Sequence, residues 1–168
     1  LGDTPEAIAA EKAGIIKPGC IVVSAPQQPE VQRVLKKQAA LQGCEIFFAK
    51  PEEGAVTQED YRGQTLSLGG LKNLNICMAG ACQAVNAVTA WEAVRAVEIA
   101  EGIKIREEDL CRGFEKTRWP GRFTCLREAP VWIVDGAHNA DGARWLKDSM
   151  ERYFPGRRLL FIMGVFRD

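Results

Sequence analysis

A short apolar run, Val131–Val134, is followed directly by the polar sequence Asp135-Gly-Ala-His-Asn139 and then by an amphipathic segment, Ala143–Tyr153. A continuous apolar run is typical of a strand buried in a parallel sheet. In open α/β sheets, ligands bind beyond the carboxyl ends of the strands, where a strand enters a glycine-containing turn and then a helix. We therefore predict an α/β fold with a ligand site at this turn.

The N-terminal part of the chain predicts a strand–helix–strand unit, with strands over 20–25 and 45–49 and a helix over 29–41 between them. Such a unit favours a parallel pair of strands with a helical crossover. An earlier helix is expected to run to Ile15, with Asp3 or Thr4 as its N-cap and Pro5 at its first position.

The middle of the chain continues the alternation. Residues 51–61 are polar and predict a loop, whereas 64–68 and 74–78 predict strands on either side of a Gly69-Gly70 turn. Helices are expected over 82–100 and 107–115, a strand pair over 123–134 and a last strand over 159–165. A linker at 117–120 divides the chain into two predicted domains, 1–117 and 118–168.

Composition excludes several classes of function. The chain has 22 basic and 22 acidic residues, so no net charge favours nucleic acid or an anionic membrane. No apolar run approaches the roughly 18 residues of a membrane span. The six cysteines form no CxxC pair, which removes the usual zinc framework and favours free thiols in a reducing cytoplasm.

Three polar residues near the predicted strand pair are candidate ligand contacts. Asp135 ends a strand, where a carboxylate accepts hydrogen bonds from a ribose hydroxyl or holds a metal-bound water; a turn or capping aspartate is an equal alternative. His138 is the only histidine and is suited to orient a carboxylate or phosphate, or to bond the backbone of its own turn. Arg122 follows a rigid Pro-Gly turn that can aim a guanidinium at phosphate oxygens, unless it is an ordinary surface arginine.

Two further residues are weaker candidates. Asn86 stands among alanine and valine on a predicted helix, where a buried amide needs partners that an adenine edge can supply. A position on the polar face of the helix or a helix–helix hydrogen bond are the alternatives. Lys12 taken alone is a solvated helix lysine.

No GxxxxGK[ST] loop occurs in the sequence, so the usual cradle for ATP phosphates is not encoded here. The chain begins without Met and stops directly after a predicted strand. We therefore expect it to be part of a longer protein, and we expect any phosphate cradle to lie upstream.

Four blocks resemble the folylpolyglutamate synthase/dihydrofolate synthase family of the Mur ligase superfamily, in the family's order. They are Leu1-Gly-Asp-Thr4 followed by Ile8-Ala-Ala-Glu-Lys-Ala-Gly-Ile-Ile-Lys-Pro-Gly19, then Gln83-Ala-Val-Asn-Ala87, Trp119-Pro-Gly-Arg-Phe123 and Asp135-Gly-Ala-His-Asn139. The resemblance implies the remainder of a Mur-ligase-type central ATPase domain, followed by the start of a Rossmann-like C-terminal domain. It implies a monomeric cytoplasmic enzyme.

The implied reaction is ADP-forming ligation of L-glutamate to a folate or dihydropteroate carboxylate through an acyl phosphate, with ATP and Mg²⁺. By resemblance, Asn86, Arg122 and Asp135 match ATP-binding positions. Lys12 matches a lysine whose carbamate helps to hold Mg²⁺, and His138 matches a histidine near ATP and the incoming glutamate. The 168-residue chain itself is expected to be inactive, because the phosphate cradle is absent.

Two positions depart from the family pattern: Cys82 stands where the family often has His, and Ala140 where it often has Pro. Two other functions stay open. A Mur-type peptidoglycan or cyanophycin-type ligase would use the same chemistry on another acceptor, and a non-catalytic nucleotide-binding module would use none.

Overall fold

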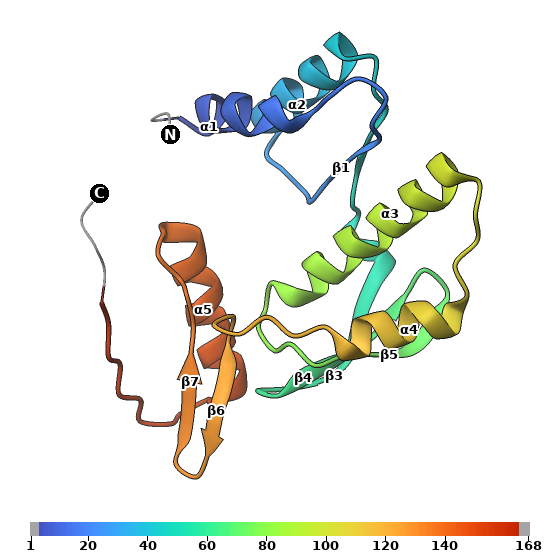
Figure 1. The fold of residues 1–168 in the computed structure, drawn as a ribbon. Coiled ribbons are helices and arrows are strands. Elements are labelled where there is room, and N and C mark those ends of the chain that lie inside the picture. The colour runs from blue at the N-terminus through green and yellow to red at the C-terminus, as the bar shows by residue number, and fades with distance from the viewer. Residues whose placement is uncertain (1–3, 165–168) are drawn as a thin grey trace. The chain divides into compact units, whose positions relative to one another are not determined.

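A computed structural model describes residues 4–164 (Figure 1). The chain divides into two compact units. The first unit comprises the residues up to 55, together with 68–70 and 85–107, and the second comprises 56–67, 71–84 and the residues from 108 onward. The predicted boundary at 117–118 concerns the domains of the whole protein, and the two units of this chain do not test it. It stays a prediction.

The first helix, α1 (Pro5–Lys12), begins as expected. The Thr4 hydroxyl oxygen accepts a hydrogen bond from the Ala7 amide at 3.2 Å, and Pro5 occupies the first position. This satisfies one of the free amides of the first helical turn. Asp3, the other predicted cap, lies outside the described residues. The α-helix ends at Lys12, and a 3-10 turn, η1 (Ala13–Ile15), completes the predicted segment.

The predicted strand–helix–strand unit is confirmed. Strand β1 (Val22–Ser24) pairs in parallel with β2 (Ile46–Phe48), with Val22 opposite Ile46, and α2 (Pro29–Leu41) connects them. Gly43 follows α2 with φ of +66°, a conformation that glycine adopts without a steric cost.

A three-stranded sheet follows, in the order β3–β4–β5. Its strands are β3 (Gly54–Asp60), β4 (Gly63–Leu68) and β5 (Leu71–Ile76), and a short 3-10 turn, η2 (Pro51–Glu53), precedes them. The prediction of a loop over 51–61 is wrong. Strand β3 is an edge strand whose side chains are exposed from residue 55 onward, so it carries no apolar alternation that would mark it.

Strand β4 alternates as predicted, and every second side chain, from Gln64 to Leu68, is buried. The turn after it has φ of +57° at Gly69 and +92° at Gly70. A Cβ at Gly69 would lie 2.3 Å from the Trp91 ring, so only glycine fits beneath this indole. Two helices follow, α3 (Gln83–Glu101) and α4 (Glu107–Lys116), close to their predicted bounds.

The predicted strand pair is β6 (Thr124–Glu128) and β7 (Val131–Val134), and α5 (Ala140–Tyr153) follows it. The pairing is antiparallel, with an irregularity at Leu126 between Cys125 and Arg127. The expectation that 131–134 is buried in a parallel sheet is therefore wrong. A two-residue connection can join only antiparallel neighbours. One face of β7 stays exposed, including Trp132 at 55%.

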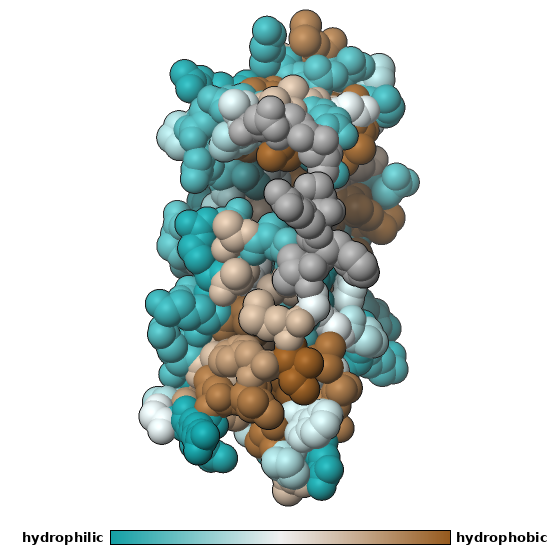
Figure 2. Space-filling model, turned by 90° about the vertical axis from the view of Figure 1, so that its left-hand side faces the viewer, coloured by the Kyte–Doolittle hydropathy of each residue, from teal (hydrophilic) through white to brown (hydrophobic). Residues whose placement is uncertain are grey.

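The predicted strand over 159–165 is not formed through residue 164, and residue 165 lies outside the described residues. Within the described part of the chain, no strand pairs with this segment, and an extended segment without a ladder partner is not a strand. Its apolar side chains are exposed, with Leu160 at 91% and Ile162 at 89%. The brown area in the lower half of Figure 2 lies over this segment and the β6–β7 hairpin.

Helices and strands are mixed along the chain, as predicted for an α/β protein. Within residues 4–164, no helix is both long enough and apolar enough to cross a membrane.

Candidate functional site

A linker turn, residues 119–123, carries the candidate arginine. The Arg122 amide donates to the Trp119 carbonyl at 3.2 Å, and Gly121 has φ of +83°. Phe123 also has a positive φ, +43°, which is rare for a residue with a side chain and costs on the order of 1–3 kcal/mol. Its ring is 4% exposed and lies 5.4 Å from the Tyr153 ring, and this packing offsets the strain.

The Asp135 carboxylate holds the linker turn against the polar turn, residues 135–139. Its Oδ2 accepts a hydrogen bond from the Phe123 amide at 2.8 Å, and its Oδ1 accepts one from the Ala137 amide at 2.8 Å. Alongside, the Gly136 amide donates to the Gly121 carbonyl at 2.8 Å. Since Phe123 follows Arg122 directly, Asp135 fixes the backbone from which Arg122 projects.

The Arg122 side chain lies against Gly136. A Cβ at Gly136 would be 3.0 Å from the Arg122 Nη1, so the absence of a side chain there makes room for the guanidinium. Within residues 4–164, the Arg122 guanidinium has no hydrogen-bond or ion-pair partner, and the residue is exposed. It therefore presents its planar array of donors to solvent, where a phosphate or carboxylate can accept them.

His138 and Asn139 complete the polar turn. The His138 Nδ1 lies 2.8 Å from the Gly136 carbonyl oxygen. Because a carbonyl only accepts, Nδ1 carries the hydrogen, and the exposed ring presents Nε2 outward. The Asn139 Oδ1 accepts from the Gly142 amide at 2.8 Å, so Asn139 is the N-cap of α5. Ala140, in place of proline, thus leaves the start of the helix intact.

Helix α5 supports the other side of the linker turn through the loop that precedes α3. Ser149 Oγ accepts from the Ala81 amide at 2.9 Å, and the Tyr153 hydroxyl oxygen accepts from the Gly80 amide at 3.2 Å. Tyr153 donates in turn to a Glu59 carboxylate oxygen at 3.2 Å. Burial, followed by the Glu59 carboxylate, raises the pKa of Tyr153, so the hydroxyl keeps its proton.

The charges of Asp135 and Arg122 both affect the pKa of the Cys82 thiol. Burial raises the pKa of its thiol, the Asp135 carboxylate adds to the rise, and the Arg122 guanidinium opposes it. The residue that departs from the family pattern is thus a neutral thiol near the candidate site.

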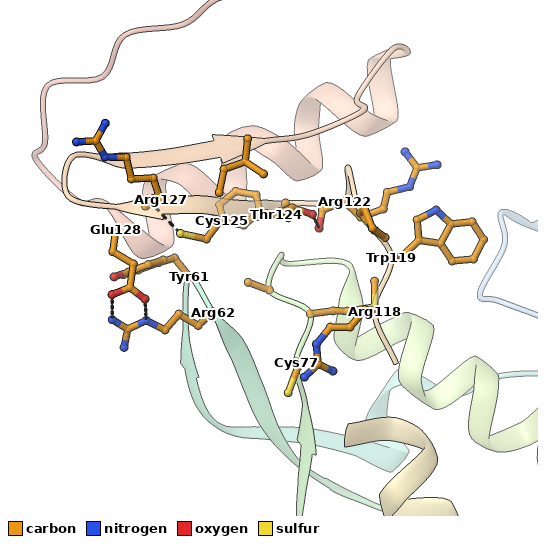
Figure 3. Close-up of a pocket in the computed structure, with 15 residues that line it drawn as sticks. Tyr61, Arg62, Cys77, Arg118, Trp119, Arg122, Thr124, Cys125, Arg127 and Glu128 are labelled. Carbon is orange, nitrogen blue, oxygen red and sulfur yellow. Dashed lines mark hydrogen bonds and ion pairs between the residues drawn. The ribbon is translucent and has the colours of Figure 1, made fainter. Parts of the chain in front are cut away.

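A cavity of about 490 Å³ adjoins the linker turn (Figure 3). A bidentate ion pair, Arg62 with Glu128, stands at one end, with both N···O distances 2.9 Å, and Trp119 and Arg122 stand at the other. Two other arginines of its lining are bonded to carbonyl oxygens: Arg118 to those of Glu115 and Thr117, and Arg127 to that of Ala129. Of the arginines that line the cavity, Arg122 is therefore the one whose guanidinium has no protein partner among the described residues.

The structure brings Arg122, Asp135 and His138 together in the second unit. Lys12 and Asn86 belong to the first unit. Lys12 is the last residue of α1, and its side chain is exposed. Asn86 is exposed on the first turn of α3, so its amide is not buried within the described part of the chain. Helix position alone did not reveal which face would be covered.

Residues 4–164 contain no group of three or more His, Cys, Asp or Glu side chains that could hold a metal ion. Three contributors to the site were not predicted: Ser149, Tyr153 and Glu59. Ser149 is a small polar residue of α5 that is only 1% exposed. Its role follows from this burial, which the sequence does not show.

No family model matches the chain. Curated relatives nevertheless match it over its whole length. The chain is 31% identical to the dihydrofolate synthase/folylpolyglutamate synthase of Bacillus subtilis, over 100% of this chain and 40% of the relative. It is 32% identical to the enzyme of the same name from Mycobacterium tuberculosis, over 100% of this chain and 37% of the relative. The chain thus spans about two fifths of the length of these relatives.

Solved structures give the same result. The chain matches Mycobacterium tuberculosis folylpolyglutamate synthase complexed with ADP, with a TM-score of 0.77 and 31% identity, over 92% of this chain and 36% of that chain. It matches an FPGS–AMPPCP–folate complex, where FPGS is folylpolyglutamate synthase, with a TM-score of 0.81 and 25% identity, over 92% of this chain and 39% of that chain.

Sequence and fold therefore agree on one class of protein, α/β synthases whose solved members include complexes with ADP and AMPPCP. Within that class, the chain matches part of the length of proteins named dihydrofolate synthase/folylpolyglutamate synthase, at 31% and 32% identity over the whole chain.

Proposed function

We propose that the chain is part of an ADP-forming ligase that joins L-glutamate to the carboxylate of a folate or dihydropteroate. ATP would transfer its γ-phosphoryl group to that carboxylate, and the glutamate amine would then displace phosphate from the acyl phosphate. The relatives named above support this proposal because they match the whole chain and carry this activity in their names.

The observation that carries the proposal within this chain is the exposed Arg122 guanidinium. A transferring phosphoryl group gathers negative charge on its oxygens, and a positioned arginine stabilises that charge. Asp135 accepts from the amide of Phe123, the residue after Arg122, and so fixes the backbone from which Arg122 projects, while the absence of a side chain at Gly136 leaves room for the guanidinium.

The remaining residues of the site receive separate roles. His138 would direct its Nε2 toward the phosphate or the incoming glutamate. Asn86 would contact the adenine edge. Asp135 would act through Arg122 while using its remaining lone pairs for a ribose hydroxyl, because each of its oxygens already accepts one backbone hydrogen bond.

Mg²⁺ belongs to the proposal for the whole protein. The described residues offer no cluster of metal ligands, so they do not by themselves fit this ion. Lys12 would contribute only after carbamylation, which turns the ammonium into an anionic group. The roles proposed above for Arg122, His138, Asn86 and Asp135 do not require these residues to bind Mg²⁺.

ADP release by the whole protein tests the proposal. We expect release that requires both L-glutamate and either dihydropteroate or a reduced folate monoglutamate. Replacing Arg122 by alanine should lower kcat/KM roughly 100-fold, as does loss of a group that stabilises transition-state charge. Arg127→Ala is the matched control, because this arginine lines the same cavity but is bonded to the Ala129 carbonyl, and its activity should be unchanged.

Other outcomes separate the alternatives. Release with a UDP-muramoyl acceptor, and none with pteridine acceptors, would identify a Mur-type ligase. Nucleotide binding without release under any of these conditions would identify a non-catalytic module. Full activity of Arg122→Ala would remove the role given to this side chain while leaving the ligase proposal intact.

We also propose that residues 1–168 alone do not turn over ATP, because the chain has no GxxxxGK[ST] loop to hold the phosphates. Enzyme-like ATP hydrolysis by the purified 168-residue chain would contradict this.

A further inference from the structure

Cys20 and Cys44 occupy equivalent positions in front of two paired strands. In the parallel pair, Val22 lies opposite Ile46, and each cysteine stands two residues before one of these partners. Side chains alternate along a strand with a period of two residues, so both cysteines point to the same side as Val22 and Ile46. Continuing this register places the two thiols face to face.

The sulfur atoms meet as the register requires. Their separation is 3.6 Å, and both side chains are half-buried, which leaves them open to a small reagent. The Cys44 thiol also lies 3.0 Å from the Lys17 carbonyl oxygen, which accepts from it, and the Cys20 amide donates to the same oxygen at 3.3 Å. One carbonyl thus orients both residues.

No other pair of cysteines within residues 4–164 brings its sulfur atoms into hydrogen-bonding range. Cys125, for example, directs its thiol to the Arg127 carbonyl. Burial and the neighbouring Cys20 thiol raise the pKa of Cys44, so the Cys44 thiol keeps its proton at neutral pH. The structure therefore contains one preformed dithiol among six cysteines.

We propose that Cys20 and Cys44 are a redox-modification site that low-molecular-weight disulfides convert to an intramolecular disulfide. One protein thiolate attacks a sulfur of the small disulfide, forming a mixed disulfide and releasing one small thiolate. The second protein thiolate then attacks the protein sulfur of the mixed disulfide and releases the second small thiolate. The two protein thiols are oxidised by two electrons, the reagent is reduced to two thiols, and these take up the two protons.

The geometry makes the second step fast relative to the first. A disulfide requires the sulfur atoms to approach to about 2.05 Å, and from 3.6 Å this needs rotation about side-chain bonds rather than movement of the strands. The bond would join the beginnings of β1 and β2 and close a loop that contains α2. A cross-link of this kind stabilises the folded state by restricting the unfolded chain.

The test is to treat the folded whole protein with oxidised glutathione, to alkylate the remaining thiols, and to map the peptides by mass spectrometry. We expect a cross-linked pair of peptides containing Cys20 and Cys44, with the loss of two hydrogen atoms, while the other four cysteines are alkylated. The urea midpoint should rise on oxidation and return to its initial value after reduction with dithiothreitol.

Three variants serve as controls. Cys20→Ser and Cys44→Ser should each keep a glutathionyl group on the remaining thiol, because the resolving partner is gone. Cys111→Ser should still form the cross-link. Circular dichroism shows whether each variant folds. If one variant does not fold, the peptide maps of the other two variants test the proposal.

Separate glutathionyl groups on Cys20 and Cys44 of the folded protein, with no cross-link, would overturn the proposal. So would cross-links distributed at random among the six cysteines, or a Cys20–Cys44 link that forms only in urea, because neither would come from the preformed pair. Failure of both thiols to react while Cys111 is modified would overturn it as well.

Discussion

The carboxylates of Asp135 and Glu128 each accept two hydrogen bonds, but from different kinds of donor. Asp135 receives the backbone amides of Phe123 and Ala137, and it joins two turns that are distant in sequence. Glu128 receives the guanidinium of Arg62, and both side chains are more than half exposed, at 60% and 57%. The number of hydrogen bonds is therefore a poor guide to their importance. A carboxylate that satisfies part-buried amides constrains the backbone, whereas an exposed ion pair competes with water.

The largest expected effect comes from Asp135→Ala. This change leaves the amides of Phe123 and Ala137 without acceptors and releases Phe123 from a strained conformation that the carboxylate helps to hold. We expect the free energy of unfolding to fall by roughly 2–4 kcal/mol, measured by urea denaturation. Asp135→Asn retains one carbonyl acceptor and should lose about half as much. A loss below 1 kcal/mol for the alanine variant would contradict the account of this carboxylate.

Tyr153→Phe should have an intermediate effect. It keeps the ring that packs on Phe123 but removes the hydroxyl that accepts from the Gly80 amide. We expect a loss of about 1–2 kcal/mol in the free energy of unfolding, because an amide in a part-buried loop is left unsatisfied. Phe154→Leu, which alters the neighbouring side chain without touching this hydrogen bond, is the comparison. Equal losses in the two variants would mean that the hydroxyl contributes little.

The Arg62–Glu128 pair should show a small coupling. In a double-mutant cycle with Arg62→Ala and Glu128→Ala, we expect an interaction free energy of about 0.2–1 kcal/mol. High salt should reduce it, since both groups are exposed and their attraction is screened. A coupling as large as the effect of Asp135→Ala would remove the contrast between the two carboxylates.

The smallest effect is a pH dependence that Cys82 contributes. Because burial raises the pKa of this thiol above its ordinary value of 9.0, the folded state binds the proton more tightly than the unfolded state. The resulting stabilisation is present below that ordinary value and is lost as the pH rises toward the raised value. The urea midpoint of the native protein should therefore fall more steeply above pH 9 than that of Cys82→Ser. Identical slopes would show that the thiol titrates normally.

Local signals in the sequence predicted the elements that carry their own pattern. The proline and capping residues of α1, the apolar spacing of α2 and the alternation of β4 all correspond to observed elements. The failures share a physical cause. Strand β3 has a polar sequence and exists because β4 pairs with it, and the apolar segment over 159–164 has no partner strand within the described residues. Strand formation depends on the neighbouring strand, and the residues of a segment do not by themselves show whether a neighbour pairs with it.

The candidate site was predictable to a similar extent. The Pro-Gly turn and the strand end located Arg122 and Asp135, and the structure brings them together with His138 in one unit. The use of Asp135 as an acceptor for two backbone amides was not predictable, because it depends on how two turns far apart in sequence meet. The same holds for Ser149 and Tyr153, which act through the backbone of Gly80 and Ala81 rather than through any ligand.

The hydrogen bonds from α5 to Gly80 and Ala81 also affect how this loop exchanges its amide hydrogens with solvent. Both amides lie in a loop, where exchange is ordinarily fast, yet their acceptors are side chains of a helix about 70 residues away in sequence. Their exchange therefore requires α5 to detach from the loop. These two amides report the local opening of α5, so residues 80 and 81 behave as part of that helix's cooperative unit although they precede α3 in the chain.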